Sequence, residues 1–461
     1  MNEIVDYTGL SHLEVSEETI ETITPILNRA YPIDVADFII DQTSLEDQLL
    51  VFNALTPEKS VLTFEYLSTR IQKIFIRELP EEKKIKLLNA LSPDDRTALL
   101  EELPPFLVSI LLKYLSPEER ALSLSLLGYP KESVGRVMTP DYISIKLDWT
   151  VQEVLDYIRK KGHDSETLNV IYAVDEKGVL VDDFRIREFL LNPLDTKVEK
   201  LSDHKFIGLL VTASIENAIL IFRKYARTAL PVIDSDGMLL GIVTVDDIMA
   251  LSVEEDTEDI QKIGGVAALS EPYIDTPFFS LMKKRAGWLI ILFVGELLTA
   301  SVMGHYEEEI SQAVVLALFL PLIISSGGNS GSQASTLIIR ALALGEISIK
   351  NWWIIMKREI FSGLFLGGIL GLMGFIRVSL WGMIFLSYGE HWLLIAITVS
   401  LSLIGVVLWG TISGAMFPLI LQRCGVDPAT SSAPFVATLV DVTGLIIFFN
   451  IALYVLKGTL L

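Results

Sequence analysis

The chain has 461 residues, of which 51% are hydrophobic and 21% charged, with a mean hydropathy of +0.48 and a net charge of −21. This composition is too apolar for an ordinary soluble protein and too charged for one that lies entirely in a membrane. The charge is uneven: residues 286–461 hold 9 acidic and 7 basic residues, a net of −2, so residues 1–285 carry the remaining −19. Such an acidic region excludes binding to nucleic acid or anionic lipid head groups and favours association with cations.

Leucine recurs at every twelfth position in the first part of the chain. The series consists of Leu55, Leu67, Leu79, Leu91, Leu103, Leu115 and Leu127. Several of these leucines precede a helix-start signal, as in Thr56-Pro57-Glu58 and Ser92-Pro93-Asp94-Asp95. Ser or Thr caps a helix, Pro fits its first turn, and acidic residues suit the positive end of its dipole. Short helices at a fixed period predict an acidic α-helical solenoid over residues 1–130.

Two stretches of residues 131–250 follow one plan, in which a helix is followed by a strand, a turn of the Asp-Gly type, a second strand and a second helix. In the second stretch the turn is Ser235-Asp236-Gly237. The tandem resembles a pair of CBS modules, an α/β regulatory fold that often binds adenine nucleotides. The resemblance implies ribose contacts from Thr244 and Asp247, with ATP as a ligand. The first copy departs from the pattern at residues 180–183, so the alternative of a pair that only dimerises or relays stays open.

A connecting segment, residues 251–283, carries acidic residues close together. Glu255, Glu258 and Asp259 stand at i, i+3 and i+4. They therefore share one face of a predicted connecting helix, where like charges repel by about a few tenths of a kcal/mol per pair. Such a face is either solvated or bridged by a hard cation, and both interpretations stay open at this point.

The last part, residues 284–461, is predicted to be an all-α transmembrane domain with five helices, because it contains long apolar runs. The expected spans are 286–304, 312–339, 356–385, 391–420 and 431–456. The flanking basic residues, among them Lys283, Lys284 and Arg285, fall on one side, and the loops on the other side are acidic or neutral. By the positive-inside rule we expect a multi-pass protein of the cell membrane with a cytoplasmic N-terminus and an external C-terminus.

The second span contains residues that are costly in lipid. Pro321 is followed by Gly327-Gly328-Asn329-Ser330-Gly331-Ser332-Gln333. Polar or distorted backbone at this depth is tolerated where it lines a cavity or packs on protein. Asn329 and Gln333 lie one turn apart, so we expect both amides, with Gly328, to line one pathway. The alternative is that the small residues serve close helix packing.

The last span carries an acidic residue, Asp441, ten residues from its start, or about 15 Å deep at ~1.5 Å per residue. That is roughly the middle of a hydrocarbon core of about 30 Å. A carboxylate there costs about 3 kcal/mol or more, so such residues usually serve a pathway. The alternative is a hydrogen-bonded Asp that holds helices together. Pro434, Ala437 and Thr438 are small and share its helical face, which leaves room for a hydrated ion.

The polar groups predicted along this pathway are carboxylate, amide, hydroxyl and backbone oxygen. Glu296 and Glu359 are further acids in or near the membrane, without an evident basic partner in the core. Such groups are ligands for a hard divalent cation. Magnesium keeps most of its waters and needs few charged ligands. One Asp441 per chain, doubled across a two-fold axis, supplies two. Manganese and cobalt fit the same ligand types.

The layout resembles the MgtE family of magnesium channels over nearly the whole chain. The segments that carry the resemblance are LSPDDRTALLEELP, the CBS pair, TVDD with EEDTEDIQKIGG, LPLIISSGGNSGSQASTLIIRALALGEI and PFVATLVDVTG. The resemblance implies a homodimer, a pore site at Asp441, and closure when cytoplasmic Mg²⁺ bridges the helical domain, the CBS pair and the connecting, or plug, helix. The regulatory metal positions that it implies are Asp94, Asp95, Glu216, Asp247, Glu255, Glu258 and Asp259. Ala226 and Ala250 stand where family members often carry acids, which implies fewer regulatory sites and a lower sensitivity to magnesium.

We therefore expect a magnesium channel or transporter gated by cytoplasmic Mg²⁺, and not an enzyme, since the sequence shows no nucleophile–base pair and no metal-binding His motif. One alternative is an ion-coupled secondary transporter of divalent metals such as Mn²⁺ or Co²⁺, for which inverted repeats are expected and none is evident. Another is a CBS-regulated chloride channel, which needs cationic or helix-dipole sites for an anion at depth. Asp441 argues against it.

Overall fold

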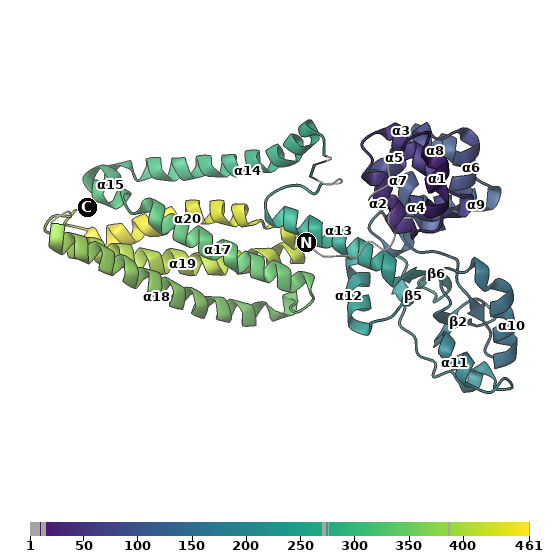
Figure 1. The fold of residues 1–461 in the computed structure, drawn as a ribbon. Helices are drawn as coiled ribbons and strands as arrows, with labels where there is room; N and C mark the ends of the chain where they lie inside the picture. The colour runs from purple at the N-terminus through teal and green to yellow at the C-terminus, as the bar shows by residue number, and fades with distance from the viewer. Residues whose placement is uncertain (1–9, 11–14, 270–272, 275, 386–387, 461) are drawn as a thin grey trace. The chain divides into compact units, whose positions relative to one another are not determined.

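The structure is a computed structural model that describes residues 10, 15–269, 273–274, 276–385 and 388–460 (Figure 1). The chain forms two compact units, Met1–Ser252 and Val253–Leu461. The expected multi-domain plan is confirmed: a helical N-terminal domain and a CBS pair make up the first unit, and the second holds five candidate membrane helices. Parts of the predicted domain 1–130 and of the connecting segment 251–283 lie outside the described residues.

The N-terminal domain is built from short helices with a regular repeat. Among the described residues these are α1 (Ile20–Leu27), α2 (Pro32–Ile40), α3 (Leu45–Asn53), α4 (Pro57–Tyr66), α5 (Thr69–Glu78), α6 (Glu81–Ala90), α7 (Pro93–Glu101), α8 (Pro105–Leu111) and α9 (Pro117–Leu127). The recurring leucines from Leu55 to Leu115 are buried in the core. Leu67, Leu79 and Leu91 each follow the last residue of a helix. Alternate helices pack on one another, α2 on α4, α4 on α6, α5 on α7 and α7 on α9, which confirms the helical repeat.

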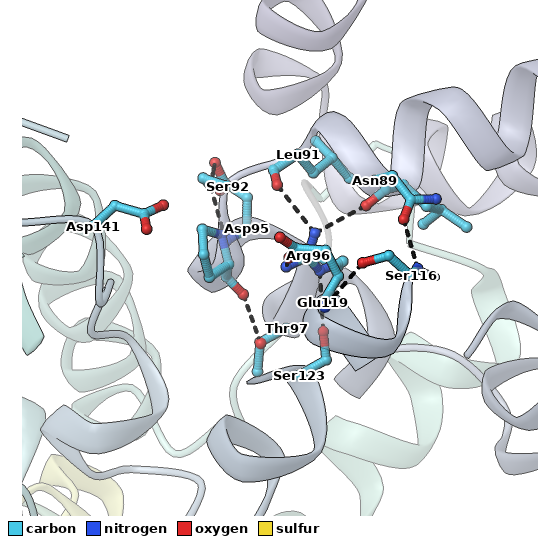
Figure 2. A network of polar contacts seen from close by, with 12 residues as sticks. Asn89, Leu91, Ser92, Asp95, Arg96, Thr97, Ser116, Glu119, Ser123 and Asp141 are labelled. Atoms are coloured by element: carbon cyan, nitrogen blue, oxygen red, sulfur yellow. Dashed lines mark hydrogen bonds and ion pairs between the residues drawn. The ribbon is translucent and has the colours of Figure 1, made fainter. Parts of the chain in front are cut away.

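The core of this domain contains one fully buried cation, Arg96 of α7 (Figure 2). Its Nε donates to the Ser123 hydroxyl at 3.0 Å, and its Nη1 donates to the carbonyls of Leu88 and Leu91 at 3.1 and 3.3 Å. Its Nη2 donates to the carboxylate of Glu119. Arg96 therefore supplies hydrogen-bond donors to the carbonyl groups at the end of α6 and links α7 to α9.

Replacing Arg96 by Met removes every one of these bonds and leaves two carbonyls and a carboxylate without a donor. Because the Glu119 side chain is 33% exposed, the main cost lies at the two buried carbonyls, and we expect the free energy of unfolding of the domain to fall by about 1–3 kcal/mol. Hydrogen exchange of α6, α7 and α9 in the full chain measures this loss. Arg120→Met, at an exposed position of α9, should change it by less than about 0.5 kcal/mol. Equal exchange in the two variants would contradict the assigned role.

The CBS pair consists of two three-stranded sheets with the same topology. Its strands are β1 (Ser144–Ile145), β2 (Val170–Val174), β3 (Leu180–Arg185), β4 (Leu209–Leu210), β5 (Ala229–Ile233) and β6 (Leu239–Thr244). In each sheet the first strand is parallel to the second, and the second is antiparallel to the third. A register shift falls at the same point of each second strand. This repetition confirms the tandem expected from the sequence.

The helices of the pair also follow the prediction. They are α10 (Val151–Lys161), α11 (Ile186–Leu191), α12 (Ile215–Tyr225) and α13 (Val245–Ile263), with short 3₁₀ turns at Val134–Arg136, Gly162–Asp164 and Val198–Lys200. Each predicted Asp-Gly turn is held by an aspartate, Asp175 or Asp234, whose Oδ1 accepts two backbone N–H groups at 2.8–2.9 Å. Helix α13 runs without a break through residue 250, where the sequence placed a domain boundary.

The second unit is helical in its described residues. Its elements are α14 (Phe278–His305), α15 (Glu307–Gln312), α16 (Val314–Ala317), α17 (Leu320–Ala343), a 3₁₀ turn (Ile349–Asn351), α18 (Trp352–Phe385), α19 (Trp392–Arg423), a second 3₁₀ turn (Pro428–Thr430) and α20 (Ala433–Leu456). Five helical segments are long and apolar enough to cross a membrane, which confirms the predicted number. Helices α17, α19 and α20 pack on one another, α18 packs on α19, and α14 packs on α20.

Glycines bring α17 and α19 into backbone contact. A Cβ atom at Gly410 would lie 2.4 Å from the Gly327 carbonyl oxygen, and one at Gly414 would lie 2.1 Å from the Gly331 carbonyl oxygen. No side chain fits at such distances, so each helix contributes two glycines one turn apart. The close-packing interpretation is therefore correct for Gly327 and Gly331, and the opposite face of α17 is left for other uses.

Candidate ion pathway and acidic cluster

A cavity of about 590 Å³ lies in the second unit among α14, α16, α17 and α20. Its lining residues are Met303, Ala317, Leu320, Pro321, Ile324, Ser325, Gly328, Asn329, Ala437 and Asp441. The structure thus brings together Asp441 and three of the residues predicted to line a pore, Gly328, Asn329 and Ala437. The ionisable side chain of this lining is an acid, and its other polar groups are an amide and a hydroxyl.

The cavity-facing position of Asp441 follows from the buried face of α20. Val436, Val440 and Gly444 are buried at i, i+4 and i+8, so Asp441 falls beside that face. Its Oδ1 lies 3.7 Å from the point where Gly328 would carry a Cβ atom. The absent side chain at Gly328 therefore leaves open space next to the carboxylate.

The other predicted pore residues, Gln333, Pro434 and Thr438, are not among the residues that line this cavity. Gln333 is exposed one turn beyond Asn329. Thr438 faces α14, where its methyl group lies 2.5 Å from the position of a Cβ atom on Gly295. Pro434 lies at the start of α20, with its ring 3.3 Å from the position of a Cβ atom on Gly265.

Glu296 of α14 is the neighbour of Asp441 that the sequence did not reveal. The two carboxyl groups are in hydrogen-bonding contact. The sequence marked both as intramembrane acids but gave no reason to pair them, because 145 positions separate them. A cation bound at Asp441 therefore has a second carboxyl group within reach.

An acidic cluster lies in the first unit, where the solenoid meets the CBS pair. It draws Glu65 from α4, Asp94 and Asp95 from α7, Glu166 from the segment before β2, and Asp247 from α13. Burial and the charges of Asp95 and Asp94 raise the pKa of Glu65 to about 7. Burial and the charges of Asp94 and Asp247 raise the pKa of Glu166 to about 7. The shifts show that these carboxylates repel one another in a place that water hydrates poorly.

The aspartates of this cluster are perturbed in the same direction. Burial and Asp95 raise the pKa of Asp94 to about 6, and burial and Asp94 raise that of Asp247 to about 6. Local hydrogen bonds hold two of them in place, since the Ser92 hydroxyl donates to Asp95 at 2.8 Å and the Thr244 hydroxyl donates to Asp247. Oδ1 of Asp94 is buried and has no hydrogen-bond partner.

The remaining predicted metal positions lie elsewhere. Glu216 is in the first turn of α12, and Glu255, Glu258 and Asp259 are on α13 in the second unit. Within the described ranges, no group of three or more His, Cys, Asp or Glu side chains is arranged to hold a metal ion. Mg²⁺ keeps several waters and is usually bound through one or two carboxylates.

A third site is a pocket of about 340 Å³ in the CBS pair, lined by three arginines, Arg185, Arg187 and Arg227, of the two modules. Its other lining residues are Asn169, Val170, Ile186, Ala226 and Thr228. Arg227 also pairs at 3.3 Å with the buried Asp183. Thr244 and Asp247, the predicted nucleotide contacts, do not line this pocket.

The departure of the first CBS copy at residues 180–183 has a structural role. Asp182 is buried, and its Oδ2 accepts from the Ser202 hydroxyl at 2.5 Å and from the amides of Asp203 and His204 at 3.0 and 3.1 Å. Asp182 therefore fixes the loop between the modules, and Asp183 engages Arg227 of the other copy.

A cavity that presents the polar side chains of Ser325, Asn329 and Asp441 among apolar helices long enough to span a membrane, in a chain that also contains a CBS pair, is typical of a multi-pass membrane transport protein. Family models match residues 320–451 (divalent cation transporter), 30–132 (MgtE intracellular N domain), and 134–190 and 198–254 (CBS domain). The magnesium transporter MgtE of Thermus thermophilus is 36% identical over 72% of this chain and 72% of its own length. That of Enterococcus faecalis is 32% identical over 71% and 70%. The chain belongs to the MgtE family.

Solved structures of soluble parts of magnesium transport proteins match about half of the chain. The cytosolic domain of the Mg²⁺ channel MgtE in complex with ATP is 30% identical, with a TM-score of 0.49, and the match covers 51% of this chain and 96% of that one.

The acidic cluster predicts a pH dependence in the absence of divalent cations. Its carboxyl groups have raised pKa values in the folded unit, so the folded form binds more protons than the unfolded form between about pH 4 and pH 7. Stability is therefore highest at the acid end of this window and falls as the pH rises through it. In EDTA, we expect the unit to melt at a higher temperature at pH 5.5 than at pH 8.

The double variant Glu65→Gln/Glu166→Gln should flatten that dependence, because an amide carries no charge at either pH. Glu58→Gln, at an exposed position of α4, serves as the matched control. Calorimetry of the full chain measures the transition. A slope in the double variant as steep as in the control would rule out the cluster as its source.

Proposed function

We propose that this protein carries Mg²⁺ across a cell membrane through the cavity at Asp441, as a homodimer in which two such sites face each other. The observation that carries the proposal is a carboxylate lining a membrane-embedded cavity whose other polar lining groups are the neutral side chains of Asn329 and Ser325. These are oxygen ligands for a hard cation. The curated relatives named magnesium transporters support the same choice of ion.

The size of the cavity favours an ion that keeps its waters. Six waters at about 30 Å³ each occupy roughly 180 Å³, well below the cavity's 590 Å³. A hydrated Mg²⁺ therefore fits beside Asp441, where one carboxylate per chain supplies charge without stripping the hydration shell. Mn²⁺ and Co²⁺ share these ligand preferences and are the competing cargo.

Regulation by the transported ion is the second part of the proposal. The N-terminus lies in the cytoplasm, and cytoplasmic Mg²⁺ binds the acidic cluster of Asp94, Asp95 and Asp247, which Glu65 and Glu166 enlarge. It also binds the α13 acids Glu255, Glu258 and Asp259 in the second unit and, separately, Glu216 of α12 in the first unit, and the pathway closes. The raised pKa values support this, because carboxyl groups that repel one another gain most from a dication.

The transport proposal is tested by Asp441→Asn in proteoliposomes. The substitution keeps the volume and removes the charge, so we expect Mg²⁺ uptake to fall at least about tenfold, the equivalent of 1.4 kcal/mol in binding. Glu359→Gln is the matched control, since Glu359 is an acid of α18 that does not line the cavity. It should keep most of the wild-type uptake. Full uptake by Asp441→Asn would remove this carboxylate from the pathway.

An ion-coupled carrier is a second candidate, favoured by the contact between Asp441 and Glu296. Paired intramembrane acids are a feature of proton-linked transporters. The same vesicles separate the two mechanisms: a channel passes Mg²⁺ at equal pH on both sides, whereas a proton-coupled carrier changes its uptake steeply with an imposed pH gradient.

We also infer a nucleotide site in the CBS pair, at the pocket of Arg185, Arg187 and Arg227. Three guanidinium groups suit the phosphates of ATP, whereas Asp247 belongs to the acidic cluster, which repels phosphate, and the Thr244 hydroxyl donates to Asp247. We expect Arg187→Gln to weaken ATP binding about tenfold or more by titration calorimetry and Thr244→Ala to leave it within about twofold. The reverse order of effects would favour the site expected from the sequence.

A further inference from the structure

One lysine of α13 is shared between two carboxylates. The Nζ of Lys262, in the last turn of the helix, lies 2.6 Å from Oε1 of Glu258 and 2.7 Å from Oδ2 of Asp427. All three side chains are about one-third exposed. Partial burial works against the charged amine, but the hydrogen bonds to Asp427 and Glu258 outweigh it and raise the pKa of Lys262. Lys262 is therefore a cation held between the connecting helix and another segment of the same unit.

Asp427 is firmly placed at the entrance to α20. Its Oδ1 accepts the amide N–H of Ala429 at 2.8 Å and so caps the 3₁₀ turn Pro428–Thr430. That turn leads directly to Ser432, whose hydroxyl oxygen caps α20 by accepting the Phe435 amide at 3.3 Å. One oxygen of Asp427 thus organises the start of α20, and the other binds Lys262.

The same junction is bonded to α17 and α14. The hydroxyls of Ser332 and Ser335 on α17 donate to the carbonyls of Ala433 and Ser431 at 3.0 and 2.9 Å. Trp288 of α14 donates its indole N–H to the Ser432 hydroxyl at 3.0 Å. A displacement of this junction therefore acts on three helices, two of which carry the cavity residues Asn329 and Asp441.

The chain beyond α13 fits against this junction as well. Gly265 has a left-handed φ of +73°, and a Cβ atom there would lie 2.7 Å from Cδ1 of Trp288 and 3.3 Å from the Pro434 ring. Leu269 donates its backbone N–H to the Gln261 side chain at 2.6 Å, which folds the segment back on the helix. The end of α13 and the residues after it thus pack closely against the start of α20, in addition to the ion pair between Lys262 and Asp427.

Once a divalent cation binds one of the two carboxylates, Lys262 can no longer form equal ion pairs with both of them. A dication at Glu258 takes over that carboxylate and repels the ammonium group, which then pairs with Asp427 alone. We propose that Lys262 is a positioning residue that reports cation occupancy at Glu258 to the Asp427 junction, and so to α17 and α20. This inference rests on the proposed function for its direction, that a bound cation favours the closed pathway.

The transport test compares wild type, Lys262→Gln, Asp427→Asn and the double variant in proteoliposomes, with internal Mg²⁺ varied. An exposed ion pair is modest in strength, and in Lys262→Gln the lost link to the Asp427 junction outweighs the removal of a competing charge at Glu258, so we expect each single variant to raise the Mg²⁺ concentration for half-closure about two- to fivefold. The double variant should show no further increase, and Lys262→Arg should stay near wild type. Lys283→Gln, an exposed lysine at the start of α14, controls for lost charge. Additive shifts, or shifts no larger than the control, would overturn the inference.

A second measurement does not depend on transport. The acylation rate of Lys262 by an amine-reactive reagent is followed by mass spectrometry on the full chain in lipid vesicles, with and without Mg²⁺. In wild type, Mg²⁺ should leave Lys262 protected, because Asp427 remains as its partner. In Asp427→Asn, Mg²⁺ should speed acylation, because Glu258 is occupied and no carboxylate remains to pair with the ammonium group. If Mg²⁺ changed the acylation rate equally in both proteins, the proposed role of Lys262 would be wrong. Absent Mg²⁺ uptake in wild type would contradict only the proposed function.

Discussion

An ionised carboxyl group that water cannot hydrate fully must be matched by positive charge or take up a proton. Both units of this chain contain carboxyl groups under that constraint. In the first unit, Glu65 and Glu166 have pKa values raised to about 7 by burial and by their acidic neighbours. In the second, Asp441 and Glu296 lie in contact among apolar helices. Under the proposed function, a hard dication relieves both, so the same ion suits the proposed pathway and its proposed regulation.

The two sites differ in what holds the carboxylates. Asp441 belongs to a single helix, α20, packed on α17 and α19, and the backbone contacts of Gly327 and Gly331 with α19 fix the face on which Gly328 and Asn329 stand. Under the proposed function, an ion can therefore arrive and leave without rearranging the packing. The acidic cluster instead draws its members from α4, α7 and α13, so neutralising it changes how strongly the solenoid and the CBS pair are held together. The arrangement at Asp441 suits the proposed passage of an ion, and that of the acidic cluster suits the proposed sensing of one.

The sequence predicted what short-range patterns encode. The leucine period predicted the solenoid, the Asp-Gly turns between strands predicted the CBS modules, and the long apolar runs predicted five membrane helices. Within helices, the i, i+4 rule brought Ala437 and Asp441 to one face correctly, but it did not separate Thr438, which turns toward Gly295 of α14. Contacts between distant elements carried no such signal. Glu65 joining Asp94, Glu296 meeting Asp441, and three arginines meeting between the modules all depend on tertiary packing that no local period specifies.

The proposed regulation would act on the proposed pathway through the start of α20. Asp441 lies nine residues beyond Ser432, roughly 13 Å along α20 at ~1.5 Å per residue, so a cation at α13 need not approach it. A helix transmits a displacement of its capped end along its length, because its backbone hydrogen bonds keep it stiff. Ser332 and Ser335 bind the same end to α17. The start of α20 is therefore a region of the second unit where a small change in side-chain pairing reaches both helices that supply polar groups to the cavity.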